Sequence, residues 1–194
     1  MNQQEKHHRE LIDYIINVTW LHQEHVLKSN SFKKRSAGFR IVRLIFGSLT
    51  AGGLVFSLLF GNIYAMTLTT TIMSFITVTM IAFDRAIDYD RLSKNEEIYA
   101  NRYWELQEEA RELLSDVVYE TSSVREVNRR FKKLKKIRKQ YKHELADGIN
   151  SKWTKRVATK LEVAKEHISE EDYIKFVPAD LILLEELENL ESQQ

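Results

Sequence analysis

The side chains with the clearest chemical potential are hydroxyls in a segment that is otherwise apolar. Thr67, Thr70, Ser74 and Thr77 recur at i, i+3, i+7 and i+10, so they form one stripe on a helix. Such hydroxyls bond back to the carbonyl four residues earlier or across to a neighbouring helix. In an oligomer the same stripe would line a water-filled path. The sequence leaves both roles open, interhelical hydrogen bonding and pore lining.

Patterns for metal binding or catalysis are weak in this sequence. It contains no cysteine, which excludes disulfides, thiolate metal sites and a cysteine nucleophile. His22 and His25 are three residues apart, but too few further ligands lie nearby for a metal site, so we expect surface or interhelical histidines. His7 and His8 are expected to be exposed near the N-terminus. Without a phosphate-binding loop, zinc signature or nucleophile elbow, we expect no enzyme, cofactor or metal.

The hydroxyl stripe belongs to a long uncharged segment. From Leu44 to Phe83 there is no Asp, Glu, Lys, Arg or His, and a charge at the bilayer centre costs about 2.5–3.5 kcal/mol. One membrane helix needs about 20 apolar residues, and Gly61-Asn62 is a turn signal. The sequence therefore predicts a two-helix transmembrane hairpin, with spans over about 41–60 and 63–83. The alternative, a buried soluble hairpin, would carry charges at helical spacing on an outer face.

The flanks of this hairpin predict its orientation. Residues 5–29 predict an amphipathic helix, and the cationic cluster Lys33, Lys34, Arg35, Arg40 and Arg43 follows. Positive charge near a span marks the cytoplasmic side, and no cleaved signal peptide is visible. We expect an inner-membrane protein with both termini in the cytoplasm. Its predicted parts are an N-terminal helix and basic segment over 1–40, the hairpin over 41–83 and a helical cytoplasmic domain over 84–194.

Small residues repeat four positions apart in the first predicted span. The pairs are Gly47 with Ala51, Ser48 with Gly52, and Gly53 with Ser57. Pairs of this kind let two backbones approach closely in lipid. The sequence does not decide whether they pack against the second span of the same chain or against another subunit.

The second span is predicted to continue as one long helix. Neither proline nor glycine occurs from Ile63 until Gly148, so we expect a continuous helix to about Tyr119. Past the membrane its apolar residues keep a 4-3 rhythm, which predicts a coiled-coil seam for oligomerisation. The seam residues are Tyr99, Tyr103, Leu106, Ala110, Leu113 and Val117.

A basic helix is predicted next, beginning at the capping box of Ser123 and Glu126. Its candidate partners are the phosphates of a nucleotide or nucleic acid, an anionic lipid surface, or the acidic segment 170–191 of this chain. We favour the acidic segment, and the net charge of +1 disfavours nucleic acid. Pro178 then permits a final helix over about Ala179–Leu190. The basic face includes Arg129, Arg130, Lys132, Lys133, Lys136 and Lys139.

The order of these features resembles the SLATT family, the two-transmembrane effectors associated with SMODS nucleotidyltransferases and SLOG domains in bacterial conflict systems. The likeness covers about residues 10–165 and includes Trp20, the basic approach to the hairpin, and the pattern Tyr99-Ala100-Asn101-Arg102-Tyr103 followed by Leu106 and Glu109. The resemblance implies oligomers that form membrane pores and stop growth or kill the infected cell. It implies a nucleotide signal from a neighbouring gene product as a frequent trigger, and no catalytic residues.

We therefore expect an all-α integral membrane protein that assembles with itself in the lipid bilayer. Its expected function is a pore-forming or membrane-disrupting effector in bacterial antiviral defence. A nucleotide second messenger or a sensor protein from a neighbouring gene is a further candidate partner. The alternative is a non-conducting, membrane-anchored scaffold that recruits a cytoplasmic partner.

Overall fold

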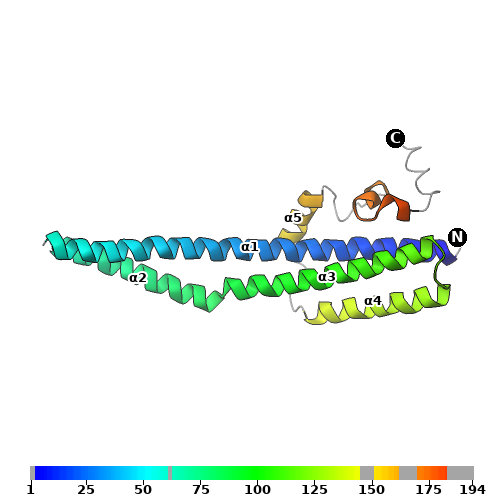
Figure 1. Ribbon diagram of the computed structural model, residues 1–194, viewed down its shortest axis with the longest axis horizontal. Helices are drawn as coiled ribbons and strands as arrows, with labels where there is room; N and C mark the ends of the chain where they lie inside the picture. The colour runs from blue at the N-terminus through cyan, green and yellow to red at the C-terminus, as the bar shows by residue number, and fades with distance from the viewer. Residues whose placement is uncertain (1–2, 61–62, 145–150, 162–169, 183–194) are drawn as a thin grey trace. The chain divides into compact units, whose positions relative to one another are not determined.

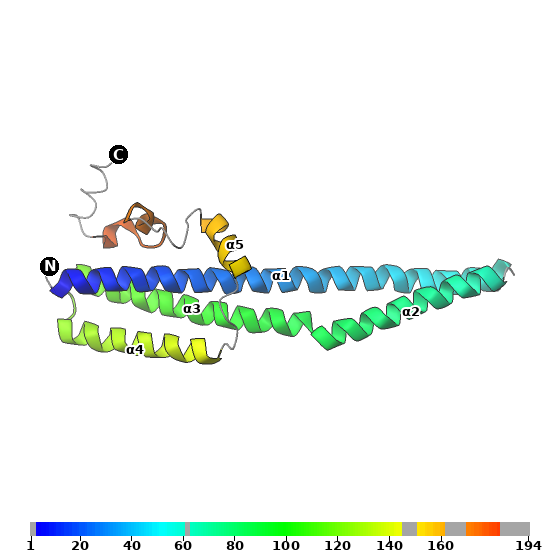
Figure 2. The same cartoon turned by 180° about the vertical axis from the view of Figure 1, so that it is seen from behind.

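All regular elements of the described chain are helices. The computed structural model describes residues 3–60, 63–144, 151–161 and 170–182. Figure 1 shows α1 (Gln3–Phe60), α2 (Ile63–Ile87), α3 (Tyr89–Val118), α4 (Val124–Glu144) and α5 (Ser151–Leu161), and Figure 2 shows them from behind. Two 3-10 turns follow, η1 (Glu170–Lys175) and η2 (Ala179–Leu181). The prediction of an all-α protein is confirmed.

The chain forms two compact units. One consists of residues 1–28 with 96–194, and we call it the core unit; the other consists of residues 29–95, and we call it the apolar unit. Helix α1 contributes to both, because it runs without a break through the amphipathic segment, the basic cluster and the first apolar stretch. The separate N-terminal helix expected over residues 5–29 is therefore the first half of a longer one.

The core unit has a conventional hydrophobic interior. The first half of α1 lies alongside α3, and α4 lies alongside α3 in both views (Figures 1 and 2). Leu11, Ile15 and Val18 of α1 and Leu113 of α3 are fully buried, and Phe131 of α4 is 3% exposed. Each such side chain gains about 1.5–3 kcal/mol from burial. Amphipathic periodicity on three helices thus produces one shared core.

The stripe predicted as a coiled-coil seam lies inside this core. His25 of α1 stacks on Tyr103 with ring centroids 5.4 Å apart, and Tyr141 of α4 meets Tyr103 edge-on at 6.1 Å. Tyr99 is half-buried. Periodicity therefore identified a buried face of α3, but its partners are α1 and α4 of the same chain rather than another subunit. The remaining members of the stripe are also buried: Leu106, Ala110, Leu113 and Val117.

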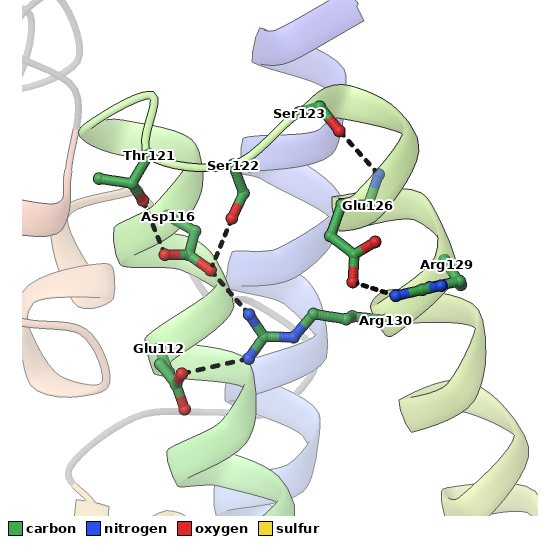
Figure 3. A network of polar contacts seen from close by, with 8 residues as sticks. All are labelled: Glu112, Asp116, Thr121, Ser122, Ser123, Glu126, Arg129 and Arg130. Carbon is green, nitrogen blue, oxygen red and sulfur yellow. Dashed lines mark hydrogen bonds and ion pairs between the residues drawn. The ribbon is translucent and has the colours of Figure 1, made fainter.

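The turn between α3 and α4 is built around Asp116 (Figure 3). Thr121 Oγ1 and Ser122 Oγ donate to its carboxylate at 2.7 and 3.2 Å. Arg130 of α4 donates to the same carboxylate at 2.7 Å. The serine half of the predicted capping box is confirmed, because the backbone N–H of Glu126 donates to Ser123 Oγ at 3.3 Å. The Glu126 carboxylate pairs with Arg129 at 2.6 Å.

The segment near Pro178 packs as a turn within the core unit. Phe176, Val177, Leu181 and Ile182 are buried, and His8 Nε2 donates to the Leu181 carbonyl at 2.9 Å. The predicted helix from Ala179 is wrong at its start, because η2 ends at an extended Ile182. Its remainder, residues 183–190, lies outside the described residues.

The prediction that His7 and His8 are exposed is also wrong. His8 is 1% exposed, and His7 is half-buried. A histidine pair next to a terminus has no periodicity of its own. The sequence therefore gave no sign that residues beyond position 170 would cover it.

In the apolar unit the second half of α1 and α2 lie side by side and antiparallel. Arg43 Nη1 of α1 lies 3.4 Å from Asp84 Oδ2 near the end of α2, and Gly53 lies against Thr70. Helix α1 ends at Phe60 and α2 begins at Ile63, which are the predicted bounds. The predicted turn, Gly61-Asn62, lies outside the described residues.

The predicted continuous second helix needs one correction, at Asp88. This residue separates α2 from α3 and has φ of +46°, a region that aspartate adopts more readily than most residues. Helical hydrogen bonding persists across the break, from Asp88 N–H to the Asp84 carbonyl at 2.9 Å and from Leu92 N–H to the Asp88 carbonyl at 3.0 Å. The Asp88 carboxylate also caps the N–H of Arg91 at 3.0 Å. The helix is thus kinked by local side-chain capping, which the absence of proline and glycine does not exclude.

Candidate functional site

The apolar unit buries hydroxyls and exposes hydrocarbon. Among its described side chains, the buried ones are Ser29, Ser36, Thr70 and Ser93, and no hydrophobic side chain is buried. In water this arrangement would be costly, because hydrophobic side chains would gain by leaving the solvent. In lipid it is favourable, since polar groups are satisfied between helices and apolar ones face acyl chains. The exposed set includes Leu44, Ile45, Leu49, Val55, Leu68, Ile72, Phe75, Val78 and Phe83.

Length and composition also indicate a membrane span in part of this unit. Among the described residues, one helical stretch, within Thr67–Val118, is long and apolar enough to cross a membrane, and 6% of its apolar window is buried. The stretch 41–60 includes side chains outside the described ones, at positions 54 and 56–60. The second crossing of the predicted hairpin therefore stays a prediction.

Thr70, in the middle of the hydroxyl stripe, packs against Gly53 of α1. It is 8% exposed, and a Cβ placed on Gly53 would lie 3.1 Å from Thr70 Oγ1. Only glycine allows this approach without displacement. Ser74 and Thr77 are half-buried, whereas Thr67 is exposed. Within one chain, the middle of the stripe therefore faces α1 and not an open surface.

Several hydroxyls of α2 are satisfied within the helix itself. Thr71, Thr77 and Thr79 each donate to the carbonyl four residues earlier, at 2.8 Å. Such bonds remove the cost of carrying a hydroxyl into an apolar environment. The intrahelical role considered for the stripe is thus present at Thr77, and such a bond leaves the oxygen able to accept from water or from another chain.

The small residues of the first span divide into two groups. Gly53 lies against α2, as described above, and the side chain of its partner Ser57 lies outside the described residues. Gly47 and Gly52 have nothing within 4 Å of a built Cβ. Ala51 and Ser48 are exposed. We call each pair a ridge. The ridge that contains Gly53 therefore packs against α2 of this chain, and the ridges that contain Gly47 and Gly52 are open, with no contact at the glycine.

A cluster of ion pairs joins α1 to the kinked junction of α2 and α3. Arg40 pairs with Asp90, and Arg43 pairs with Asp84 at 3.4 Å. Hydrogen bonding from the Ser36 hydroxyl, and then from Arg40, holds the pKa of the Asp90 carboxyl below its usual value of 3.8. The cationic cluster predicted for its effect on topology thus also connects α1 to the end of α2 and the start of α3.

Aromatic rings and serines complete this junction. Phe39 and Phe32 stack against Tyr89 with centroid distances of 5.6 and 6.2 Å. Ser29 and Ser93 each donate to the other's carbonyl, at 3.0 and 3.1 Å. These contacts were not predicted from the sequence. The spacing of seven between Ser29 and Ser36 was the available signal, because it places both on one helix face.

The histidines considered as metal ligands connect helices of the core unit. His22 Nδ1 donates to the Ala100 carbonyl at 2.9 Å, and His25 Nδ1 lies 2.6 Å from Glu96 Oε2. The interhelical role expected for them is confirmed. No group of three or more potential metal ligands occurs among the described residues.

The basic face of α4 is exposed at Arg129, Lys132, Lys133, Lys136 and Lys139. Arg130, the sixth residue of the basic face, is half-buried. It forms ion pairs with two acids of α3, Asp116 at 2.7 Å and Glu112 at 3.3 Å (Figure 3). In the predicted partner, segment 170–191, most of the acidic side chains lie outside the described ones. That pairing stays a prediction.

Two concave regions lie near the start of α4. A cavity of about 180 Å³ is lined by His7, Val117, Ser122 and neighbouring residues, which is below the roughly 300–1,000 Å³ of typical small-molecule sites. A second region of about 820 Å³ is lined only by residues between Ser123 and Lys132. Because one segment provides all of its lining, it is an open helix surface. Neither region indicates a nucleotide site.

Comparison with known proteins gives one match. A family described as SMODS and SLOG-associating 2TM effector domain family 4 matches residues 9–155. The match includes both apolar stretches, the kinked junction, α3, α4 and the start of α5. No curated protein and no solved structure matches this chain.

Proposed function

Because this chain belongs to the family of SMODS and SLOG-associating 2TM effector domains, a family of membrane effectors in conflict and defence systems, we propose that it oligomerises and permeabilises the bacterial inner membrane. The expected outcome is growth arrest or death of the infected cell. The trigger in this proposal is a nucleotide second messenger or a sensor encoded nearby. The protein acts by assembly and not by catalysis.

The observation that carries this proposal is the inverted burial of the apolar unit. Its described buried residues are hydroxyls, and Leu44, Phe75 and Val78 are 64–73% exposed. In the proposed topology both α1 and α2 cross the bilayer. The cations Lys33, Lys34 and Arg35, all exposed, keep the first flank in the cytoplasm. Both termini then lie on the cytoplasmic side.

Assembly within the membrane is supported by the open small-residue ridges. Gly47, Ser48, Ala51 and Gly52 have no neighbour that would obstruct another backbone. Helices associate in lipid through close packing at such residues. Pore lining by the hydroxyl stripe further requires Thr70 to leave its contact with Gly53. We therefore place the stripe on the water-filled path only in the activated oligomer.

The test is leakage of dye or ions from liposomes that contain the purified full-length protein and its activator. Replacing Ser74 and Thr77 by leucine is expected to reduce leakage, since it removes hydroxyls from the path. Thr70→Leu is made separately because it also disturbs the packing on Gly53. The matched control replaces Thr69 and Thr79 by leucine, two hydroxyls outside the stripe. Equal leakage from the stripe and control variants would remove the stripe from the mechanism.

A membrane-anchored scaffold remains the second candidate, and the independent hydrophobic core of residues 1–28 with 96–194 favours it. Such a scaffold would recruit a cytoplasmic partner without conducting ions. Planar bilayers containing the activated protein distinguish the two functions. Discrete current steps support the pore, whereas electrical silence together with a stable captured partner supports the scaffold.

A further inference from the structure

The outer face of α3 carries a line of acids. Glu97, Glu105, Glu108 and Glu112 are exposed, and Asn101 completes the spacing of i, i+4, i+8, i+11 and i+15. Residues at these intervals share one helix face. We call this set the acidic stripe. It lies opposite the face of α3 that contributes Tyr103, Leu106 and Leu113 to the core.

The outer face of α4 carries a matching line of cations. Exposed side chains at i, i+4, i+7, i+11 and i+14 form it, and no acid interrupts it. It lies opposite Val127, Phe131 and Leu134, the buried residues of α4. We call this set the basic stripe: Arg125, Arg129, Lys132, Lys136 and Lys139.

The two stripes do not neutralise each other within the chain. Each points away from the core that both helices share, and the cation that crosses from α4 to Glu112 is Arg130, outside the basic stripe. Figure 3 shows Arg130 directed toward α3 and Arg129 directed away from it. Arg129 is 77% exposed at its side chain, and its ion pair is with Glu126 of its own helix.

We infer that the acidic stripe of one copy binds the basic stripe of a second copy of this chain. This assigns an interface to the assembly proposed above, and it rests on that proposal only in taking the partner to be the same protein. The stripes match in length, at roughly 22 Å for α3 and roughly 21 Å for α4 with a rise of 1.5 Å per residue. A contact between unlike faces is heterologous, so repetition closes a ring or extends a filament.

An exposed aromatic residue supplies an anchor beside the acids. Trp104 is 51% exposed and lies three residues after Asn101 and four before Glu108, at the edge of the stripe. Exposed ion pairs are individually weak, whereas a tryptophan covered by a partner is a frequent energetic centre of interfaces and attracts lysine and arginine. The interface therefore combines a charge-matched line with one aromatic contact. It weakens as salt is raised, because its charges are solvent-exposed.

Charge reversal tests this assignment on the full-length protein in detergent. The basic-stripe variant carries Lys132→Glu, Lys136→Glu and Lys139→Glu, and the acidic-stripe variant carries Glu97→Lys, Glu105→Lys and Glu108→Lys. Each alone is expected to weaken self-association by about tenfold or more, measured by light scattering across a concentration series. Combining all six substitutions in one chain, or mixing the two variants, is expected to restore association.

The matched control reverses three exposed lysines outside the stripe, Lys142, Lys152 and Lys155, and is expected to leave association unchanged. Failure of the two variants to rescue each other would overturn the interface, and would direct attention to lipid headgroups or the acidic C-terminal segment as partners of α4. An equal loss in the control would also overturn it. Rescue of association without any liposome leakage would keep the interface and remove the pore proposal. Liposome leakage that is unchanged in both charge-reversal variants would keep the pore proposal and remove the interface.

Discussion

In the core unit the side chains buried among α1, α3 and α4 are mainly Leu, Ile, Val, Phe and Tyr, whereas the buried side chains described in the apolar unit are three serines and a threonine. The same helix, α1, contributes to both patterns. Its first half buries Leu11, Ile12 and Ile15, and its second half exposes Leu44 and Leu49. The two halves are therefore adapted to different surroundings.

This contrast indicates which force stabilises each unit. Water drives the hydrophobic residues of the core unit together, because burying them removes apolar surface from the solvent. A lipid environment gives no such gain, so the helices of the apolar unit depend on close packing at Gly53 and on hydrogen bonds such as Ser29 with Ser93. Substitutions of equal size should consequently have unequal effects in the two units.

The largest difference is expected for leucine truncation. Leu113→Ala in the core unit, where Leu113 is fully buried, should lower the free energy of unfolding by about 2–5 kcal/mol. Leu49→Ala, at a side chain 54% exposed in the apolar unit, should change it by about 0.5 kcal/mol or less. Thermal and denaturant unfolding in detergent, followed by circular dichroism, measures both. Equal losses would show that the burial contrast has no energetic counterpart.

Glycine substitutions in α1 should have different effects on stability at the ridge that contacts α2 and at the open ridges. Gly53→Val is expected to force α1 and α2 apart at Thr70, at a cost of about 1–3 kcal/mol for overpacking, because even a Cβ lies 3.1 Å from Thr70 Oγ1. Gly52→Val introduces the same side chain one residue earlier, where nothing lies within 4 Å. The difference between the two melting temperatures in detergent measures the contact. A larger effect at Gly52 in the monomer would contradict the helix pairing.

A smaller effect is expected at the serine pair of the kinked junction. Ser29 and Ser93 exchange hydrogen bonds at 3.0 and 3.1 Å, and a buried hydrogen bond contributes about 0.5–1.5 kcal/mol. The single variants Ser29→Ala and Ser93→Ala and the double variant form a double-mutant cycle. We expect a favourable coupling energy in that range, and a coupling near zero would mean that the two serines act independently.

The smallest effect concerns Asp90 and pH. Its folded pKa is lowered by Ser36 and Arg40, so the ionised carboxylate stabilises the fold above the usual value of 3.8, and this contribution disappears as the pH falls through the lowered pKa. The melting temperature of Asp90→Asn should therefore lie below that of the wild type near neutral pH, with the difference closing below about pH 3.8. A difference that stays constant down to acidic pH would assign the effect to side-chain shape rather than to charge.

Several elements could be predicted because their signals are local. The cap at Ser123 depends on residues three positions apart, and the helix ends at Phe60 and Ile63 flank the only Gly-Asn pair in the uncharged segment. The stripe from Tyr103 to Val117 was recognised as a buried face for the same reason, its spacing. Its partner was misassigned, because periodicity reports that a face is covered and not what covers it.

Other elements depended on contacts between residues far apart in the sequence. His8 is buried because Leu181 meets it from 173 positions away, and nothing near either residue indicates the other. At the kink, the Asp88 carboxylate accepts a hydrogen bond from the backbone N–H of Arg91. The Arg40–Asp90 ion pair lies two residues further along the chain. A conformation that requires only two or three hydrogen bonds leaves little trace in composition.

By itself the sequence determined that this chain is helical, that one segment lacks charge for long enough to enter lipid, and that a strongly basic helix precedes an acidic C-terminal segment. Those properties follow from residue type and spacing along one chain direction. Only the tertiary structure decided that the stripe of α3 packs against α1 and α4, that Thr70 faces Gly53, and that two charged stripes remain uncovered. The physical reason is that a helix face is fixed by local geometry, whereas its neighbour is selected by packing among all faces at once.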